Sequence, residues 1–262
     1  MREFALTVND GDSLKGLAWE IKHPIANVVV FQGMEEHGAR YDEFSKILND
    51  NGINVYILDC YGQGLNVKDD LSKRSIVPNG FFDKMVDAHF AMVEEAKKNG
   101  AKTYIYAHSM GSFMGQKIIQ RHPGCVDKIV LCGTGCKNPA VGIGAVLAKG
   151  AGTGKKRNQK AKFLNKLMFG NFNKIIKNPK TDYDWLTINE VNVAQYVEDP
   201  LCGYGPTNGF CYEFLCGMNS LYTKEGLNSI KKDLKIFLIS GAEDPVTNYG
   251  KATQKMFDLY TS

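Results

Sequence analysis

The sequence has few features of an exported, membrane-spanning or metal-binding protein. Its seven cysteines include no C-x-x-C pair, which favours reduced thiols over a disulfide framework or a zinc site. The opening residues, MREFALTVNDGDSLKG, lack the apolar segment of a secretory signal peptide. No apolar run reaches the length that crosses a bilayer. We therefore expect a cytoplasmic protein without a metal.

The charge pattern does not indicate a nucleic-acid partner. The net charge is +4 over 262 residues, and the basic run KKRNQKAK at 155–162 is local, so we interpret it as a solvated surface. The glycine-rich stretch GAGTGKK at 150–156 is similar to a phosphate loop. However, Lys149 and Lys156 occupy positions where that loop requires Gly and Ser or Thr. Nucleotide binding is therefore not predicted either.

Five short apolar runs are separated by helical patterns. They are rich in Val, Ile, Tyr and Phe and do not alternate with polar residues, as expected for strands that are buried on both faces. Strands that alternate with helices indicate the α/β class, with a doubly wound, mostly parallel sheet. The five runs are NVVVF (27–31), INVYIL (53–58), KTYIYA (102–107), DKIVLC (127–132) and LKIFLIS (234–240).

Two further features complete the predicted organisation. The runs 3–9 and 14–21 are expected to pair as a hairpin at one sheet edge, with NDGD at 9–12 as the turn. After Cys132 the next strand run begins only at 234. We interpret 136–226 as an inserted helical cap, which leaves 1–135 and 227–262 as the two parts of the core. Four apolar cap residues could line an acyl channel or pack on the core: Leu164, Leu167, Met168 and Phe169.

The segment AHSMG at 107–111 follows a predicted strand and precedes a predicted helix. A serine hydroxyl becomes a nucleophile only when a base removes its proton and donors stabilise the resulting oxyanion. A sharp turn between a strand and a helix exposes such a serine, and it needs small neighbours because the turn is crowded. The sequence therefore predicts Ser109 as the nucleophile, with the N–H of Met110 as one oxyanion donor.

The remaining site residues are expected at the ends of other strands. The loop QGMEEHGARY at 32–41 follows the first parallel strand, and its Met34 N–H is the candidate second oxyanion donor. Asp244 follows the strand that ends near Ser240, in the chain order in which this fold places its triad acid. Its neighbour Glu243 is the other carboxylate in that loop.

Four segments resemble motifs of the monoacylglycerol lipase and lysophospholipase group of α/β-hydrolases, also described as the S33 serine aminopeptidase type. AHSMGS resembles G-H-S-M-G-S, and DCYGQG (59–64) resembles D-x-R-G-H-G. DWLTINEVNVAQYVEDPLCGYGPTNGF (184–210) resembles the family's cap. The loop motif H-G-x-x-E-H-x-x-R-Y is matched at Gly33, Glu36, His37, Arg40 and Tyr41.

The resemblance implies a serine esterase that acts on single-chain acyl lipids and uses no metal or cofactor. Its partner would be a small acyl ester, with transient contact to a lipid surface and no stable insertion. The sequence departs from the family at Gln32, Tyr61 and Gln63, where the motifs have His, Arg and His. These departures concern local hydrogen bonding rather than the fold.

The triad base has no candidate in the expected place. The family's histidine follows the acid, but none of the five histidines follows Asp244. His37 is the nearest substitute, and the resemblance gives it a structural role. Two hypotheses remain: a serine hydrolase whose last strand and histidine lie beyond Ser262, or a non-catalytic α/β-hydrolase-like binding protein. Under the first hypothesis, residues 1–262 alone are expected to be inactive or weakly active.

Overall fold

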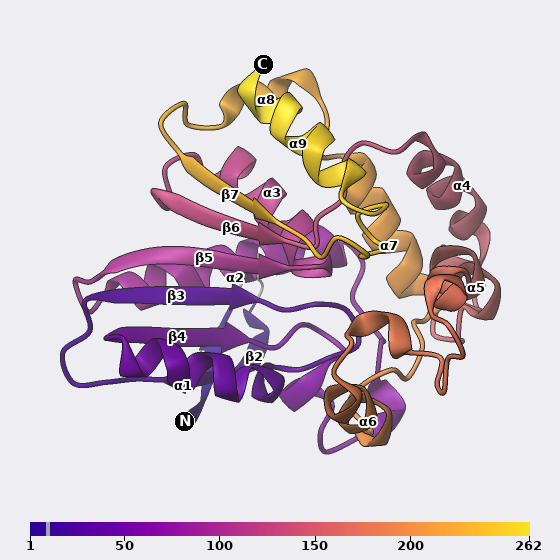
Figure 1. Ribbon diagram of the computed structural model, residues 1–262, viewed down its shortest axis with the longest axis horizontal. Coiled ribbons are helices and arrows are strands. Elements are labelled where there is room, and N and C mark those ends of the chain that lie inside the picture. Colours follow the sequence, from indigo (N-terminus) through magenta and orange to yellow (C-terminus); the bar gives the residue numbers. More distant parts are fainter. Residues whose placement is uncertain (9–10) are drawn as a thin grey trace.

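The computed structural model describes residues 1–8 and 11–262. Seven strands form one sheet in the order β1-β2-β4-β3-β5-β6-β7, with helices on both of its faces (Figure 1). From β4 to β7 all neighbouring strands are parallel. The strands are β1 Arg2–Thr7, β2 Ser13–Trp19, β3 Ala26–Phe31, β4 Ile53–Leu58, β5 Lys102–His108, β6 Lys128–Cys132 and β7 Lys235–Ile239.

This arrangement confirms the predicted fold class. The hairpin is also present, because β1 and β2 pair antiparallel from Arg2 opposite Ala18 to Thr7 opposite Ser13. The turn predicted at 9–12 includes residues 9–10, which lie outside the described residues. The helices are α1 Asp42–Asp50, α2 Phe81–Lys97, α3 Met110–Arg121, α4 Pro139–Thr153, α5 Lys162–Phe169, α6 Glu190–Glu198, α7 Asn208–Asn219, α8 Lys224–Ser229 and α9 Lys251–Thr261.

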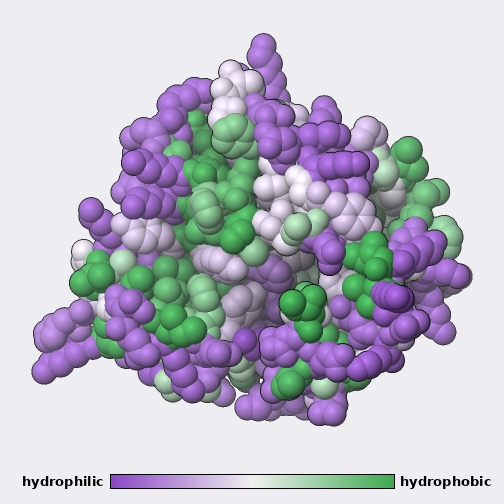
Figure 2. All heavy atoms as spheres, in the orientation of Figure 1, coloured by the Kyte–Doolittle hydropathy of each residue, from purple (hydrophilic) through white to green (hydrophobic). Residues whose placement is uncertain are grey.

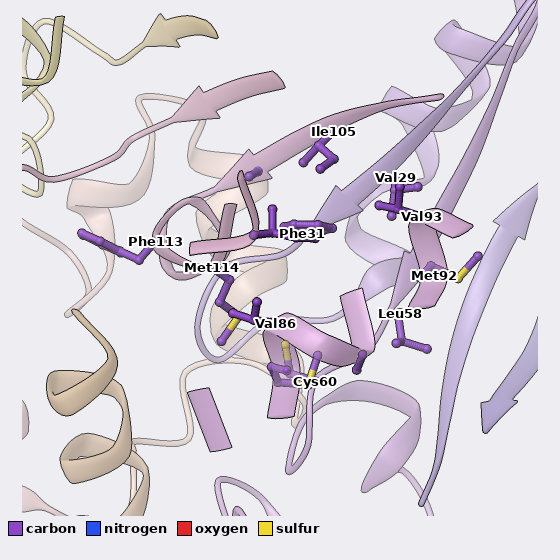
Figure 3. Packing of buried hydrophobic residues seen from close by; sticks show 14 of the residues in the cluster. Val29, Phe31, Leu58, Cys60, Val86, Met92, Val93, Ile105, Phe113 and Met114 are labelled. Atoms are coloured by element: carbon purple, nitrogen blue, oxygen red, sulfur yellow. The ribbon is translucent and has the colours of Figure 1, made fainter. Parts of the chain in front are cut away.

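The central strands are buried on both faces, as their uninterrupted apolar sequences predict. In β3, Val29, Val30 and Phe31 are all 0% exposed. Val29 and Phe31 pack with α2 and α3, whereas Val30 faces the cluster that includes Phe44 of α1. Figure 3 shows side chains of α2 beside Val29 and Phe31 in the larger of these two clusters. Burial of such side chains is worth about 1.5–3 kcal/mol each.

The chain between β6 and β7 forms a layer beside the carboxyl ends of the parallel strands (Figure 1). Helix α7 anchors this layer, because the rings of its Phe210 and Phe214 pack at tilted angles against Phe81 and Phe82 of α2. Helix α4 packs on α7 through small buried residues, which let the two helices approach closely. The boundaries 136 and 226 that we proposed for the cap stay predictions.

Strand β7 lies at one edge of the sheet and pairs with β6. Phe237 and Ile239 on this strand are 60% and 43% exposed, and hydrophobic side chains gather over β7 in Figure 2. Among the described residues, no strand follows β7, and α9 is the last element. A further strand beyond residue 262 stays a prediction. In the ranges 1–8 and 11–262, none of the helices has the length and apolar character required to cross a bilayer.

Candidate active site

Ser109 lies on a sharp turn between β5 and α3. Its backbone angles are φ 48° and ψ −117°, a conformation that non-glycine residues rarely adopt without support from their surroundings. The Ser109 N–H donates to the Cys132 carbonyl at 2.9 Å, and the Ser112 hydroxyl donates to the Ser109 carbonyl at 2.5 Å. These bonds hold the strained turn that the AHSMG segment predicted.

The first turn of α3 is packed tightly against the end of β3. A Cβ atom at Gly111 would lie 2.2 Å from the Phe31 carbonyl oxygen, so only glycine fits there. The Gly111 N–H also donates to the Gln32 carbonyl at 3.0 Å. This contact brings the start of α3, which carries Met110, beside the loop at 32–41, which carries Met34.

Met34 and Met110 both line the same cleft as Ser109. Met110 is the first residue of α3, so its N–H has no acceptor within the helix. Among the hydrogen bonds of the described residues, neither the Met34 nor the Met110 N–H has an acceptor. One unused amide at the N-terminus of α3 and a second in the loop at 32–41 favour a negative charge on a bound group. Their role as an oxyanion hole stays a prediction.

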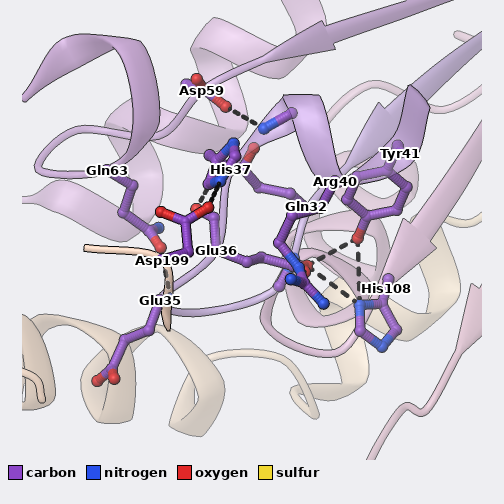
Figure 4. Close-up of polar contacts among 12 residues, drawn as sticks. Gln32, Glu35, Glu36, His37, Arg40, Tyr41, Asp59, Gln63, His108 and Asp199 are labelled. Atoms are coloured by element: carbon purple, nitrogen blue, oxygen red, sulfur yellow. Dashed lines mark hydrogen bonds and ion pairs between the residues drawn. The ribbon is translucent and has the colours of Figure 1, made fainter. Parts of the chain in front are cut away.

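A buried carboxylate fixes the loop that carries Met34. The Glu36 Oε1 atom accepts the Gly33 N–H at 2.5 Å and the Tyr41 hydroxyl at 2.7 Å, and lies 3.3 Å from His108 Nδ1 (Figure 4). Burial opposes ionisation of Glu36, but the bonds with His108, Tyr41 and Gly33 outweigh it and lower its pKa to about 2. Glu36 is therefore ionised, and its bonds with Gly33 and Tyr41 hold the two ends of the loop at 32–41 together.

Two glutamines occupy positions where the sequence departs from the family, and both are fully buried. The Gln63 Oε1 atom accepts the Glu35 N–H at 2.6 Å, and Gln32 Nε2 donates to the Glu36 carbonyl at 3.1 Å. Glu35 has a φ of 57°, so the bond from its amide supports a strained turn next to Met34. Gln32 and Gln63 thus order this loop, which their residue types alone did not reveal.

Asp244 lies in the loop after β7 and lines the cleft. Its Oδ1 atom accepts the Val246 N–H at 2.8 Å. Its Oδ2 atom lies 3.6 Å from the point where a Cβ of Gly133 would stand, and His108 Cδ2 lies 3.9 Å from the same point. Asp244 therefore faces the strand-end region near the elbow. No hydrogen bond between Asp244 and an imidazole occurs among the described residues.

His108 is the histidine that shares the cleft lining with Ser109. Its Nδ1 atom is directed to Glu36 and lies 3.2 Å from the Tyr41 hydroxyl. Burial disfavours the imidazolium form, but the hydrogen bond and charge of Glu36 outweigh burial and raise the pKa of His108. An imidazole whose Nδ1 atom is held by Glu36 and Tyr41 supports the loop and is a poor general base for Ser109.

The other histidines lie outside the cleft lining. His37 Nε2 lies 2.8 Å from Asp199 Oδ2, which joins the loop at 32–41 to the segment after α6. His89 is 0% exposed and stacks on Phe31. His122 caps the end of α3 and stacks on a phenylalanine of α2.

The cleft has a volume of about 1640 Å³ and is bounded by the elbow on one side and by apolar side chains of the cap on the other. The four cap residues that we considered for an acyl channel separate into two groups. Met168 and Phe169 line the cleft. Leu164 packs in the cluster between α4 and α7, and Leu167 is 58% exposed. The apolar cap side chains of the cleft include Met168, Phe169, Phe172, Trp185, Phe214, Leu215 and Met218.

His37, Asp199 and Cys202 place suitable metal-ligand atoms within 4.8 Å of one another. Burial raises the pKa of Asp199, but the bond with His37 and the nearby charge of Arg40 outweigh burial and lower it. The Arg40 guanidinium also lies 5.0 Å from the Tyr196 ring centre. Because the Asp199 carboxylate is already bonded to His37 and to the Leu201 N–H, with the charge of Arg40 nearby, this group fits a contact between cap and core better than a cation site.

A mostly parallel sheet with a serine on the β5–α3 elbow, beneath inserted helices, defines an α/β-hydrolase. The family model described as serine aminopeptidase, S33, matches residues 22–262. The chain belongs to this family, which confirms the resemblance inferred from the motifs.

A curated relative is lysophospholipase L2 from Escherichia coli (strain K12). It is 32% identical over 130 residues, which cover 49% of this chain and 38% of the relative. The chain thus spans well under half the length of the curated relatives it matches.

Solved structures share the fold at low sequence identity. A thermostable carboxyl esterase from Bacillus coagulans, in complex with glycerol, superposes with a TM-score of 0.85 at 23% identity, over 99% of this chain and 86% of that one. A lipase in an open form gives 0.86 at 19% identity, with the same coverage of each chain. A monoglyceride lipase variant from Saccharomyces cerevisiae, in complex with a substrate analog, gives 0.70 at 15%, over 97% and 80%.

Proposed function

We propose that the protein is a serine hydrolase that cleaves carboxylic esters of single-chain acyl lipids, of monoacylglycerol or lysophospholipid type, through an acyl-enzyme on Ser109. One observation carries the proposal: Ser109 lies at a positive φ in a cleft that also contains two amides without acceptors. The names of the relatives, a lysophospholipase, a carboxyl esterase and a monoglyceride lipase, support an ester substrate.

The proposed reaction has two steps. The Ser109 Oγ atom attacks the ester carbonyl carbon while a base takes its proton, and the oxyanion accepts hydrogen bonds from the amides of Met34 and Met110. The C–O bond to the alcohol then breaks, and the protonated base returns the proton to the leaving oxygen. Water attacks the acyl-enzyme in the same way, which releases the fatty acid and restores the serine.

The lining of the cleft supports a single acyl chain as the substrate. Apolar side chains of the cap, including Met168, Phe169 and Phe214, face the same cleft as Ser109. Burial of an acyl chain against these side chains contributes a free energy of about 25 cal/mol per Å² of apolar surface removed from water. A long acyl chain therefore gains binding energy that a short ester does not.

The general base that takes the proton of Ser109 is the part of this mechanism that has no assigned residue. We propose that Asp244 orients an imidazole that residues 1–262 do not supply, because His108 is bonded to Glu36 and His37 is bonded to Asp199. Residues 1–262 alone would then hydrolyse esters weakly, since loss of a triad member costs on the order of 10⁴–10⁶ in rate. The alternative hypothesis, a non-catalytic protein that binds acyl esters, rests on the same observation.

A fluorophosphonate probe tests the nucleophile. The product of the gene read to its stop codon should be labelled, and Ser109→Ala should abolish labelling. Ser72→Ala is the matched control, because Ser72 is a surface residue bonded to Asp70, and it should label normally. Labelling that survives Ser109→Ala would refute the assignment. Absence of labelling in the parent protein would favour the binding protein.

Ester hydrolysis by residues 1–262 tests the base. Activity should be far below that of the gene product read to its stop codon, and added free imidazole should raise it in a Ser109-dependent manner. Equal activity of the two proteins, with no response to imidazole, would contradict the missing-base argument.

A further inference from the structure

The charges of the molecule are strongly segregated. Residues 136–181 contain ten lysines, one arginine and no aspartate or glutamate. Since the whole chain has 32 Lys and Arg and 28 Asp and Glu, the remaining residues carry 21 cations and 28 anions. This segment therefore has a net charge of +11, whereas the rest of the molecule has −7. A field of this kind favours a negatively charged partner.

These cations face solvent and are largely unopposed. All ten lysines of the segment are exposed. Within the part of the chain that the structure describes, the ion pairs of this segment are Arg157 with Glu213 at 3.1 Å and Lys180 with Glu190 at 2.8 Å. Most of the positive charge therefore has no acidic partner on the protein itself.

Helix α4 exposes apolar side chains beside this charge. Ile143, Val146 and Leu147 are 64%, 75% and 58% exposed and form an i, i+3, i+4 stripe. The opposite face of α4 buries only small residues. Figure 2 shows hydrophobic side chains gathered at the edge of the molecule where Figure 1 places α4. A surface helix ordinarily directs its polar residues to water and its apolar stripe to the core. In α4 the large apolar side chains face water instead.

Helix α5 repeats the pattern. Phe163 and Leu167 are 71% and 58% exposed, one turn apart. Exposed lysines, Lys162 and Lys166, precede each of them by one position. Exposed apolar residues interleaved with lysine are typical of helices that lie in a membrane interface, with the apolar side chains among the acyl chains and the ammonium groups at the phosphates.

We propose that this face, formed by the stripes of α4 and α5 and the lysines of residues 136–181, docks on an anionic lipid bilayer. Charge complementarity selects this occupant. A second copy docking through the same face would meet an equal positive charge, and a neutral bilayer would use only the apolar stripes. The acidic remainder of the molecule is repelled by an anionic surface, so the field also orients the protein.

Docking by this face would bring the cleft to the bilayer. Lys162, Lys166 and the 97% exposed Ile188 line the cleft that contains Ser109 and are themselves exposed. A single-chain lipid could then move from the bilayer into the cleft without crossing water. The docking inference goes beyond the proposed function, because it concerns the outer surface and holds whether or not Ser109 reacts.

Vesicle sedimentation tests the proposal with the full chain. Binding to vesicles of phosphatidylcholine with phosphatidylglycerol should exceed binding to phosphatidylcholine alone and should weaken as salt increases. The triple variant Lys149→Gln, Lys155→Gln and Lys156→Gln avoids the cleft lining. It should reduce partitioning on the order of a hundredfold, at roughly fivefold per lysine near the surface.

Two further variants separate charge from apolar contact. The matched control Lys22→Gln, Lys102→Gln and Lys235→Gln removes the same charge near the amino ends of β3, β5 and β7, and it should bind as the parent does. Val146→Gln with Leu147→Gln should weaken binding even at low salt. Circular dichroism confirms that each variant is folded.

Three outcomes would overturn the proposal: no binding to anionic vesicles, equal binding to neutral and anionic vesicles, or equal losses in the cap and control variants. Binding to RNA or to an acidic protein in the absence of vesicle binding would assign the face to another partner. Because sedimentation does not depend on hydrolysis, failure here is distinguishable from failure of the esterase assignment.

Discussion

Helices α3 and α4 both carry glycines and large apolar residues, yet they meet different surroundings. Ten of the twelve residues of α3 are buried, whereas α4 buries four of fifteen. Helix α3 is enclosed by the sheet, α2 and α8. Helix α4 packs chiefly on α7, so its outer stripe remains exposed. The comparison shows that apolar composition indicates a tendency to be buried, and that the neighbours of a helix decide which residues are buried.

Packing requires the glycine at Gly111 of α3 but not the one at Gly150 of α4. At Gly111 in α3, a side chain would collide with the backbone of β3. At Gly150 in α4, nothing lies within 4 Å of the position that a Cβ would occupy. The first glycine is required by packing beside the candidate nucleophile, and the second only lowers the stability of a helix.

Gly111→Ala should have the largest effect on stability. The added Cβ would stand 2.2 Å from the Phe31 carbonyl oxygen, and a backbone atom cannot move aside as a side chain can. We expect a loss of about 2–4 kcal/mol in the free energy of unfolding, measured by urea denaturation. Fluorophosphonate labelling should also fall, because the start of α3 would shift. A loss below about 0.5 kcal/mol would show that the elbow is adaptable.

Acid should destabilise the α2–α3 side of the core through His89. Burial lowers the pKa of His89 from 6.5 to about 3. The unfolded chain therefore takes up this proton below pH 6.5, and the folded chain does so only near pH 3. The contribution of neutral His89 to the free energy of unfolding is fully present above pH 6.5. It is lost as the pH falls from 6.5 towards 3, by about 1.4 kcal/mol per pH unit.

The variant His89→Phe isolates this effect from that of the carboxylates. It keeps a ring against Phe31, on which His89 stacks, and removes the titrating group. The difference in unfolding free energy between the parent and the variant should change steeply between pH 6.5 and 5. A difference that is constant over this range would mean that His89 becomes protonated in the folded protein.

Gly150→Ala should give the smallest effect, with the opposite sign. The position has open space and lies within α4, so alanine should stabilise the helix by about 0.5–1 kcal/mol. Thermal unfolding should show a higher Tm than that of the parent chain. If the variant were less stable, α4 would have a packing partner at this position that the structure does not contain.

The sequence by itself determined the alternation of strands and helices, the mostly parallel sheet and the position of Ser109 at a strand-to-helix turn. These follow from local patterns, because uninterrupted β-branched runs and small residues around a serine have few structural solutions. The catalytic roles of Ser109, Asp244, Met34 and Met110 stay predictions.

Only the tertiary structure decided how distant residues meet. It joined Glu36 to His108 and His37 to Asp199, and it showed that Gln63 supports the Met34 loop through Glu35. It also divided the apolar residues of the cap among cleft, cluster and surface. No local pattern contains this information, because burial and hydrogen bonding depend on which segments pack together, and contacts between residues far apart in sequence are fixed only when the whole chain folds.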